Sequence, residues 1–492
     1  MKKVFITVIA MFLPMLASAI HFTADYKDDN GYFYMLNQED LTAMITYEWS
    51  IDYLSDWTYS KSYSGNIVIP SSFVNRDDGL TYTVTSIEGH AFYQCDGLTS
   101  VIIPSSVKSI DGYAFEGCSG LTSVFIPKSV ESIGWRAFGS CTNLTTLTIE
   151  NDSETAIDGY AFSDCSNLTT LNIPNSVTRI SEGAFDETGW YNSQTDGLTY
   201  AGYVAYKYKG TMPNGTNIVI KNGTVAIAEH AFIDCSGLSS ITIPGGVKFI
   251  GKVAFGGCTS LSSVDIPVGV TSIEERTFYG CSSLASATIP DGMESIGDAA
   301  FYGCGLTSII IPSSVLSIYS HAFECNDLLS VTSYITEPFN TSIGSGNNID
   351  KIFSENTYRN GTLYVPVDTK ELYSRYDGWR DFLKIVEKED VFYYLSIQDS
   401  SNGTVDMKVK NGSKCTLRIS PKDGKTIKNV YFNDDDVTSQ LNSENNYTTP
   451  AITANSTLRV VYKGDKRGDL NGDDKVDVAD HVELSKIILV TE

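Results

Sequence analysis

One motif recurs along half of the chain and constrains its fold more than any other feature. Aligned on a phenylalanine that usually follows alanine, the copies are 22 to 24 residues apart, except for one gap of 47 residues. A single copy could not bury its own apolar side chains, so the copies must stack on one another. The period therefore predicts a solenoid of about ten 23-residue coils. The aligned phenylalanines are Phe92, Phe115, Phe138, Phe162, Phe185, Phe232, Phe255, Phe278, Phe301 and Phe323.

The positions within one copy indicate a strand and a turn. Val101 and Ile103 are two residues apart, which is the spacing of one face of a strand. Pro104 follows and predicts the strand end, because proline cannot donate to a ladder. The Ala-Phe pair places a small residue and a ring at the same height in every coil, so stacked coils would form an internal column of phenylalanine rings.

Eight of the ten cysteines stand three residues after the repeat phenylalanine, as Cys95 does after Phe92. Because they are equivalent in the repeat, we interpret them as buried free thiols that behave as small apolar residues. Disulfides are the alternative, since neighbouring coils lie only about 4.8 Å apart. Cys325 and Cys415 fit no column and have no assigned role.

The pattern I-x-x-x-A-F-x-x-C-x-x-L-x-x-[VI]-x-I-P-x-x-V resembles the BspA-like, or Treponema-type, leucine-rich repeats of bacterial surface proteins. The match covers residues 87–332. The resemblance implies a secreted or cell-surface protein of a bacterium that binds host or neighbouring-cell macromolecules. Members of this family are described as adhesins, so extracellular-matrix or cell-surface proteins and glycans are the implied partners.

The regions around the repeat predict a mainly β chain with end caps. Alternating runs such as LSIQ, GTVDMKVK, CTLRIS, NVYF and TLRVVY predict a small all-β module after the repeat. Thr369 to Val386 has helical spacing and predicts a helix. The expected organisation is a signal peptide (1–19), an N-terminal cap (20–86), the solenoid (87–332, with a hairpin insertion at 186–222), a C-terminal cap (333–390), a β-sandwich-like spacer (391–463), and a partial dockerin-like calcium loop and helix (464–492).

Charge and leader sequence narrow the location and the partners. The formal net charge of −24 argues against nucleic acid and anionic membranes, because both need a basic surface. Lys2 and Lys3, an apolar stretch and the small residues Ala17 to Ala19 predict a secretory signal peptide. No later segment is apolar for long enough to span a bilayer, so we expect no membrane insertion.

Two groups of side chains are candidate partner-binding residues. One is an outward column on the predicted sheet, where threonine is the commonest residue and the apolar members stand out. The other is the insertion, which predicts a β-hairpin around Ala201-Gly202 and carries several aromatic residues. The alternative for the hairpin is that its rings pack on each other and on the adjacent coil. The candidates are Ile102, Phe125 and Ile310 on the sheet, and Trp190, Tyr191, Tyr203 and Tyr206 in the hairpin.

The segment DLNGDDKVDVAD, from Asp469 to Asp480, predicts a calcium site. Oxygen side chains fall at loop positions 1, 3, 5, 9 and 12, and position 7 offers a main-chain carbonyl, which supplies the six or more oxygens that calcium needs. The loop resembles that of a type I dockerin, although position 6 is Asp474 instead of glycine and only one loop is present. The resemblance implies that the calcium ligands are Asp469, Asn471, Asp473, Lys475 (carbonyl), Asp477 and Asp480, and that the cohesin-recognition positions are Val478 and Ala479.

No motif in the chain predicts an enzyme. There is no G-x-S-x-G, H-E-x-x-H or phosphate-binding loop, and His90, His230 and His321 occupy one repeat position. We therefore expect an exported, non-enzymatic recognition or adhesion protein that binds through the solenoid. The alternatives are a dockerin-bearing subunit of a cohesin–dockerin assembly that targets polysaccharide or protein, and a secreted enzyme.

Overall fold

The computed structural model describes residues 26–46, 63–152, 155–339 and 351–388, and shorter stretches from residue 392 onwards (392–399, 403–410, 414–419, 427–433, 435–442, 445–450, 456–462 and 488–489). The predicted signal peptide lies outside the described residues. The chain forms two units: Met1–Thr332, Phe339–Thr362 and Arg375–Lys384 belong to the first, and Ser333–Pro338, Leu363–Ser374 and Ile385–Glu492 to the second.

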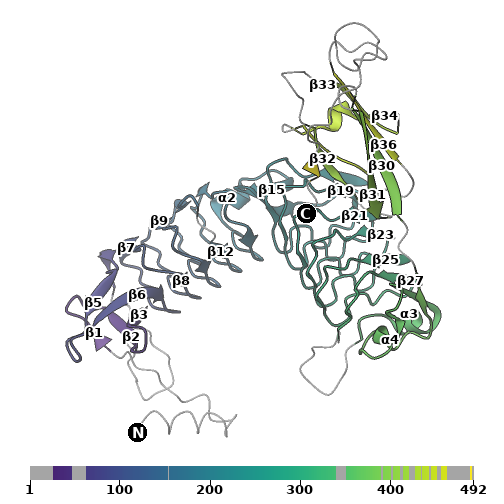
Figure 1. Cartoon of the computed structure of the whole chain (residues 1–492). Coiled ribbons are helices and arrows are strands. Elements are labelled where there is room, and N and C mark those ends of the chain that lie inside the picture. The colour runs from purple at the N-terminus through teal and green to yellow at the C-terminus, as the bar shows by residue number, and fades with distance from the viewer. Residues whose placement is uncertain are drawn as a thin grey trace. The chain divides into compact units, whose positions relative to one another are not determined.

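The first unit is a leucine-rich-repeat solenoid, as the period predicts (Figure 1). Each coil has a longer strand at the L-x-x-V-x-I segment, which ends before the proline. The longer strands pair in parallel with the equivalent strands of neighbouring coils, as β9, β11 and β13 do. These strands are β4 (Gly65–Val68), β7 (Leu98–Ile102), β9 (Ser123–Ile126), β11 (Thr146–Ile149), β13 (Thr170–Asn172), β17 (Thr216–Val219), β19 (Leu238–Thr242), β21 (Ser263–Asp265), β23 (Ser286–Thr288), β25 (Ser308–Ile311) and β27 (Ser330–Ser333).

A two-residue strand follows in most coils and forms a second parallel ladder. Its isoleucines pair with one another in register, for example Ile110 with Ile133. Because both ladders keep the same register, each apolar column of the sequence becomes a continuous column in space. The short strands are β8 (Ser109–Ile110), β10 (Ser132–Ile133), β12 (Ala156–Ile157), β14 (Arg179–Ile180), β18 (Ala226–Ile227), β20 (Phe249–Ile250), β22 (Ser272–Ile273), β24 (Ser295–Ile296) and β26 (Ser317–Ile318).

The repeat phenylalanines form two stacked runs in the core. Centroids of successive rings lie 4.8–5.6 Å apart from Phe92 to Phe185. The distances are 5.1–5.6 Å from Phe232 to Phe353. Phe353 lies outside the sequence repeat, yet its ring continues the second run. At the other end, the Tyr63 ring lies 4.7 Å from that of Phe92.

The segment before the first copy supplies a further coil and a small sheet. The strand β4 pairs in parallel with β7, so the run YSGNIVIPSSF forms a coil, as its likeness to the repeat suggested. The strand β6 (Thr81–Ile87) joins the short-strand ladder by pairing with β8. The other strands here are β1 (Tyr26–Lys27), β2 (Phe33–Asn37), β3 (Thr42–Thr46) and β5 (Ser72–Val74).

The insertion contains a short helix and the predicted β-hairpin. These elements are α2 (Gly189–Asn192), β15 (Gly197–Ala201) and β16 (Val204–Lys209), and Gly202 at the hairpin tip has a φ of 61°. The strand β16 pairs in parallel with β18, and β17 pairs with β19. The insertion therefore supplies a coil of its own, and the solenoid has about thirteen coils.

The helix predicted for Thr369 to Val386 is wrong in length. The helix α4 (Lys370–Tyr373) is one turn long, and Gly378 has a φ of 81°, which an α-helix cannot contain. The apolar residues of this segment nevertheless cover the end of the phenylalanine run, because the rings of Trp379 and Phe382 lie 6.0 and 5.1 Å from that of Phe353. The helix α3 (Glu355–Asn360) precedes α4.

The second unit contains strands for each alternating run of the C-terminal region. A five-stranded sheet has the order β31-β30-β36-β33-β34, and β35, β32 and β37 form a second sheet. A small core includes Leu417, Val430 and Leu458. The elements are β28 (Thr362–Val365), β29 (Ile385–Glu387), β30 (Phe392–Asp399), β31 (Gly403–Lys410), β32 (Thr416–Arg418), β33 (Ile427–Phe432), β34 (Asp435–Asp436), η1 (Thr438–Gln440), β35 (Asn446–Thr448), β36 (Ser456–Tyr462) and β37 (Ile488–Leu489).

Candidate functional site

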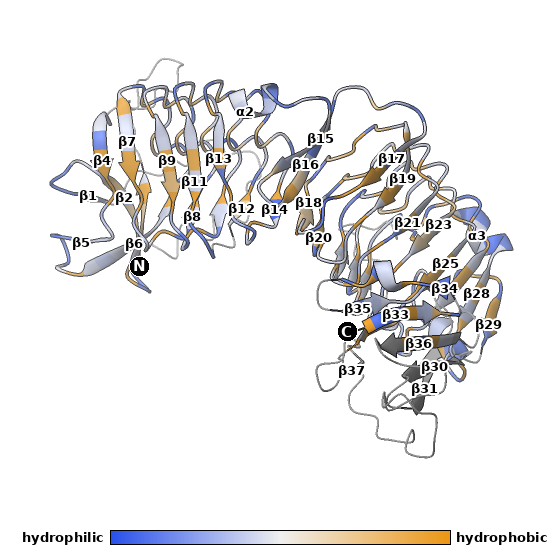
Figure 2. Ribbon diagram, turned by 90° about the horizontal axis from the view of Figure 1, so that it is seen from above, coloured by the Kyte–Doolittle hydropathy of each residue, from blue (hydrophilic) through white to orange (hydrophobic). Residues whose placement is uncertain are grey.

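Three exposed apolar side chains lie on neighbouring long strands at the start of the solenoid. Ile102 is 60% exposed, Phe125 is 52% exposed and Val68 is 58% exposed. Val68 pairs with Ile102 across β4 and β7, and Phe125 holds the equivalent position on β9. Figure 2 shows β4, β7, β9, β11 and β13 side by side. The structure thus brings the predicted residues Ile102 and Phe125 together and adds Val68. Val68 was not predicted from the sequence because β4 precedes the first full copy.

We call the outward side chains of β4, β7, β9, β11, β13 and the residues just before them the strand face. It carries no charged residue, although the chain as a whole has a formal net charge of −24. Hydroxyls on this face bond between coils: Thr99 and Ser100 both donate to the Asn66 side chain, at 2.9 and 2.8 Å. The strand face consists of Asn66, Val68, Thr99, Ser100, Ile102, Thr122, Ser123, Phe125, Thr145, Thr146, Thr148, Thr169, Thr170 and Asn172.

Ile310 does not lie with the other predicted sheet residues. It is 45% exposed on β25, in the second run of coils. Val219, at the equivalent position of β17, is 75% exposed and was also missed by the sequence search. Between these two strands the column is polar, since Asp265 and Thr288 pair across β21 and β23.

The aromatic residues of the insertion differ in how exposed they are. Trp190 and Tyr191 are half-buried, and the Trp190 ring makes an edge contact with the Phe185 ring at 5.8 Å. Lys207 and Lys209 lie over the Tyr191 ring, at 5.6 and 5.2 Å. Tyr203 is 49% exposed beside the hairpin tip. Of the four predicted hairpin residues, Tyr203 is the most accessible to a partner.

Tyr206 is buried, so its assignment as a partner-binding residue is wrong. It is 1% exposed, and its hydroxyl accepts a hydrogen bond from the Phe185 main-chain N–H and donates one to Asp186, both at 3.0 Å. In regular coils this N–H donates to the alanine carbonyl of the next coil, as Phe162 does to Ala184. The Tyr206 hydroxyl replaces that carbonyl where the insertion interrupts the repeat, which is a structural role.

All ten cysteines are buried free thiols, as the repeat position of eight of them predicts. Most thiols donate to the carbonyl oxygen of the phenylalanine one coil earlier, over 2.9–3.2 Å. Cys325 joins this series by donating to Phe301, so it belongs to the column although it is one residue out of sequence register. Cys415 belongs to the core of the second unit. The donors are Cys118, Cys141, Cys165, Cys258, Cys281, Cys304 and Cys325.

The predicted calcium loop lies outside the described residues. This applies to the ligands Asp469, Asn471, Asp473, Lys475, Asp477 and Asp480, and to Val478 and Ala479. Within the described ranges, no group of three or more His, Cys, Asp or Glu side chains is placed to hold a metal ion. No helix in the same part of the chain is both long enough and apolar enough to cross a bilayer.

The parallel ladders, the phenylalanine runs and the thiol column define a leucine-rich-repeat solenoid with an exposed, uncharged strand face. The family model described as "BspA type Leucine rich repeat region (6 copies)" matches residues 85–209 and 203–330, which together span half of the chain. The chain therefore belongs to the BspA-type leucine-rich repeat family, and the family resemblance of the sequence is confirmed.

Several solved structures are similar to this chain. A leucine-rich repeat protein from Bacteroides ovatus is 22% identical, with 74% of this chain and all of that chain covered and a TM-score of 0.29. A leucine rich cell surface protein from Faecalibacterium prausnitzii is 28% identical, with 64% and 96% covered and a TM-score of 0.28. The pneumococcal vaccine antigen PcpA is 20% identical, with 75% and 100% covered and a TM-score of 0.36. No curated protein matches the chain.

Proposed function

We propose that this protein is an exported, non-enzymatic recognition or adhesion protein that binds host or neighbouring-cell macromolecules through the strand face. The observation that carries the proposal is the exposed trio Val68, Ile102 and Phe125 on an uncharged surface. Isolated exposed apolar residues are common, but three on adjacent strands form a contiguous patch of the kind found at interaction sites. An aromatic ring at such a place is a suitable anchor for a protein partner.

Export is part of the same proposal and is supported by the sequence from Met1 to Ala19. A surface that lacks charge gains nothing from ionic attraction, so contact through the strand face depends on apolar burial and on hydrogen bonds to Thr and Ser hydroxyls. Binding there is therefore less sensitive to salt than binding through acidic regions of the chain. The partner class is an extracellular-matrix or cell-surface protein or glycan.

The test is to measure, with a biosensor, binding of the full chain to immobilised extracellular-matrix proteins. Phe125→Ala and Ile102→Ser should each weaken binding, and raising the salt concentration should change it little. Leu316→Ala is the matched control, since Leu316 is 70% exposed but lies beside the short strand β26. Equal binding by Phe125→Ala and the wild type would exclude the strand face. Tyr203→Ala tests the hairpin without removing the Tyr206 contact to Phe185.

The second candidate is a dockerin-bearing subunit of a cohesin–dockerin assembly, and the spacing of oxygen side chains from Asp469 to Asp480 favours it. In that case Val478 and Ala479 would contact a cohesin and calcium would order the loop. The discriminating measurement is binding of a type I cohesin to the full chain with calcium and with a chelator. Calcium-dependent binding that Val478→Asp abolishes would favour this function.

A further inference from the structure

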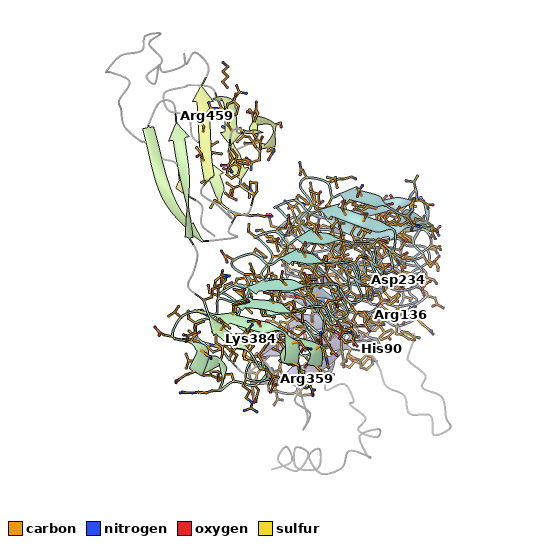
Figure 3. The ribbon with its side chains drawn as sticks, turned by 90° about the vertical axis from the view of Figure 1, so that its right-hand side faces the viewer. His90, Arg136, Asp234, Arg359, Lys384 and Arg459 are labelled. Atoms are coloured by element: carbon orange, nitrogen blue, oxygen red, sulfur yellow. The ribbon has the colours of Figure 1, made fainter. Side chains whose placement is uncertain are left out.

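A row of aromatic side chains lies on another side of the four coils that contain Phe92, Phe115, Phe138 and Phe162. We call this surface the turn face and define it as the residues from four before to two after each of these phenylalanines. The rings of His90 and Tyr113 stack at 4.9 Å with planes 13° apart. The Trp135 and Tyr160 rings meet edge to face at 4.8 Å. His90 and Arg136, which hold equivalent repeat positions, lie on the same side of the coils in Figure 3.

Trp135 is both held in place and accessible. A Cβ atom on Gly159 of the next coil would lie 2.5 Å from Cζ3 of the indole, so only glycine there leaves room for the ring to lie across that coil. Gly159 thus covers one side of the Trp135 ring, yet the residue remains 44% exposed. A large ring fixed by packing with an open face loses little conformational entropy when a partner binds.

The coils on either side of Trp135 each carry an aspartate one repeat position before that of the tryptophan. Asp111 in the preceding coil and Asp158 in the following coil hold the repeat position that Gly134 holds in the Trp135 coil. Burial raises the pKa of both carboxyls. Among the residues that the structure describes, nothing pairs with the Asp158 carboxylate. Asp111 is half-buried and accepts a hydrogen bond from the Ser109 side chain, whereas Asp158 is exposed, so a cation can approach the Asp158 carboxylate from solvent.

The turn face as a whole is acidic. Its only guanidinium, Arg136, is already held by Glu116 at 2.7 Å and by Asp164 at 3.5 Å. The remaining carboxylates have no lysine or arginine of the turn face to balance them. The acidic residues of this face are Glu88, Asp111, Glu116, Asp158 and Asp164.

We propose that Trp135, Asp111 and Asp158 bind a lysine or arginine side chain in a basic segment of a partner protein. The cation would lie over the open indole face, where the ring quadrupole attracts it, and near carboxylates of opposite charge. A neutral sugar could also stack on the indole, but it would gain nothing from the carboxylates. Charge complementarity therefore favours the basic segment. This surface goes beyond the strand face, which is uncharged and lies on another side of the same coils.

Fluorescence anisotropy with the full chain tests the proposal. The probes are labelled peptides of alternating arginine and glycine, of lysine and glycine, and of serine and glycine. The two basic peptides should bind and the serine peptide should not. Trp135→Ala should weaken binding of the basic peptides about fivefold, because the cation–π contact is lost. Asp158→Asn should weaken it by a similar factor, and circular dichroism should show both variants folded.

Two matched controls separate a defined site from attraction by the overall negative charge. Asp152→Asn removes one exposed carboxylate and Leu316→Ala removes one exposed apolar side chain, both outside the turn face. Neither should change peptide binding. Equal loss in Asp158→Asn and Asp152→Asn, or no loss in Trp135→Ala, would overturn the proposal in favour of general charge attraction. A neutral oligosaccharide that bound to the wild type but not to Trp135→Ala, with no peptide binding, would overturn it in favour of a glycan site.

Discussion

The aromatic rings of Phe138 and Phe162 stack with their centroids 5.2 Å apart and their planes 1° from parallel. Phe115 stacks on the other face of Phe138 at 4.8 Å, and all three side chains are fully buried. Each coil therefore contributes one ring that only its neighbours can bury, which ties the stability of a coil to the coils beside it.

Removing a ring from this column should destabilise the solenoid strongly. Phe138→Ala should lower the free energy of unfolding by about 3–5 kcal/mol, because it removes buried surface and leaves a cavity between two coils. Phe125→Ala, on the strand face of the preceding coil, should change it by less than about 0.5 kcal/mol. Urea unfolding followed by circular dichroism compares the two. Similar losses in both variants would contradict the assignment of inward and outward faces.

Val253 should be replaceable with a gain in stability. Its φ is 54°, which lies in the left-handed region. Other residues two positions before the repeat phenylalanine also have a positive φ, including His90 at 65° and Tyr113 at 62°. A β-branched residue is strained in the left-handed region, and asparagine tolerates that region better. Val253→Asn should raise the free energy of unfolding by about 1 kcal/mol. Val268→Asn, at an exposed position outside the left-handed region, is the control and should be near neutral in urea unfolding.

The solenoid thiols should resist alkylation in the folded protein. They are buried, and burial raises the pKa of the Cys235 thiol to about 11 and raises that of Cys118 as well. The reactive thiolate is therefore scarce at pH 8. Iodoacetamide labelling followed by mass spectrometry should show slow labelling of the solenoid thiols in the native chain, fastest among them at Cys235, which is 8% exposed. In urea all ten cysteines should react, and rapid native labelling of Cys118 would contradict the buried column.

Glu88 should make stability depend on pH. Burial raises the pKa of this carboxyl above its ordinary value of 4.5, and its Oε2 atom is buried without a hydrogen-bond partner in the described residues. An acid with a raised folded-state pKa favours folding when protonated, so its contribution is greatest below pH 4.5 and falls as the pH rises through the folded-state pKa. Glu88→Gln should therefore stabilise the protein at pH 7 but not at pH 4. Glu131→Gln, at an exposed carboxylate, is the control in thermal unfolding.

The predicted calcium loop should bind one calcium ion. Isothermal titration of the chelator-treated full chain should show one site, and replacing Asp469 and Asp480 with alanine should abolish it, because these are the first and last ligands of the loop. Asp435→Ala, in the strand β34 of the second unit, should leave binding unchanged. Unaltered calcium binding after loss of both loop residues would locate the ion elsewhere.

The repeat made most of the first unit predictable. Because equivalent residues recur at a fixed period, the residue types in each column predict whether that column is buried. The inward side chains of the strands, the phenylalanine column and the burial of eight thiols were predicted in this way. The exceptions lie where the period fails. Phe353 and Cys325 belong to columns by position in space, and the one-turn helix at Lys370 replaced a longer predicted helix because Gly378 breaks the helical path.

The sequence alone determined that the chain is a stacked solenoid, because a period with apolar residues at fixed offsets can bury them in one way only. It could not determine which exposed residues meet, because neighbours on a surface come from different coils and from segments outside the period. Tertiary structure placed Val68 beside Ile102, buried Tyr206 where a hydroxyl substitutes for a missing carbonyl, and packed Trp135 against Gly159 of the next coil. Those placements depend on through-space packing between coils, which local sequence patterns do not record.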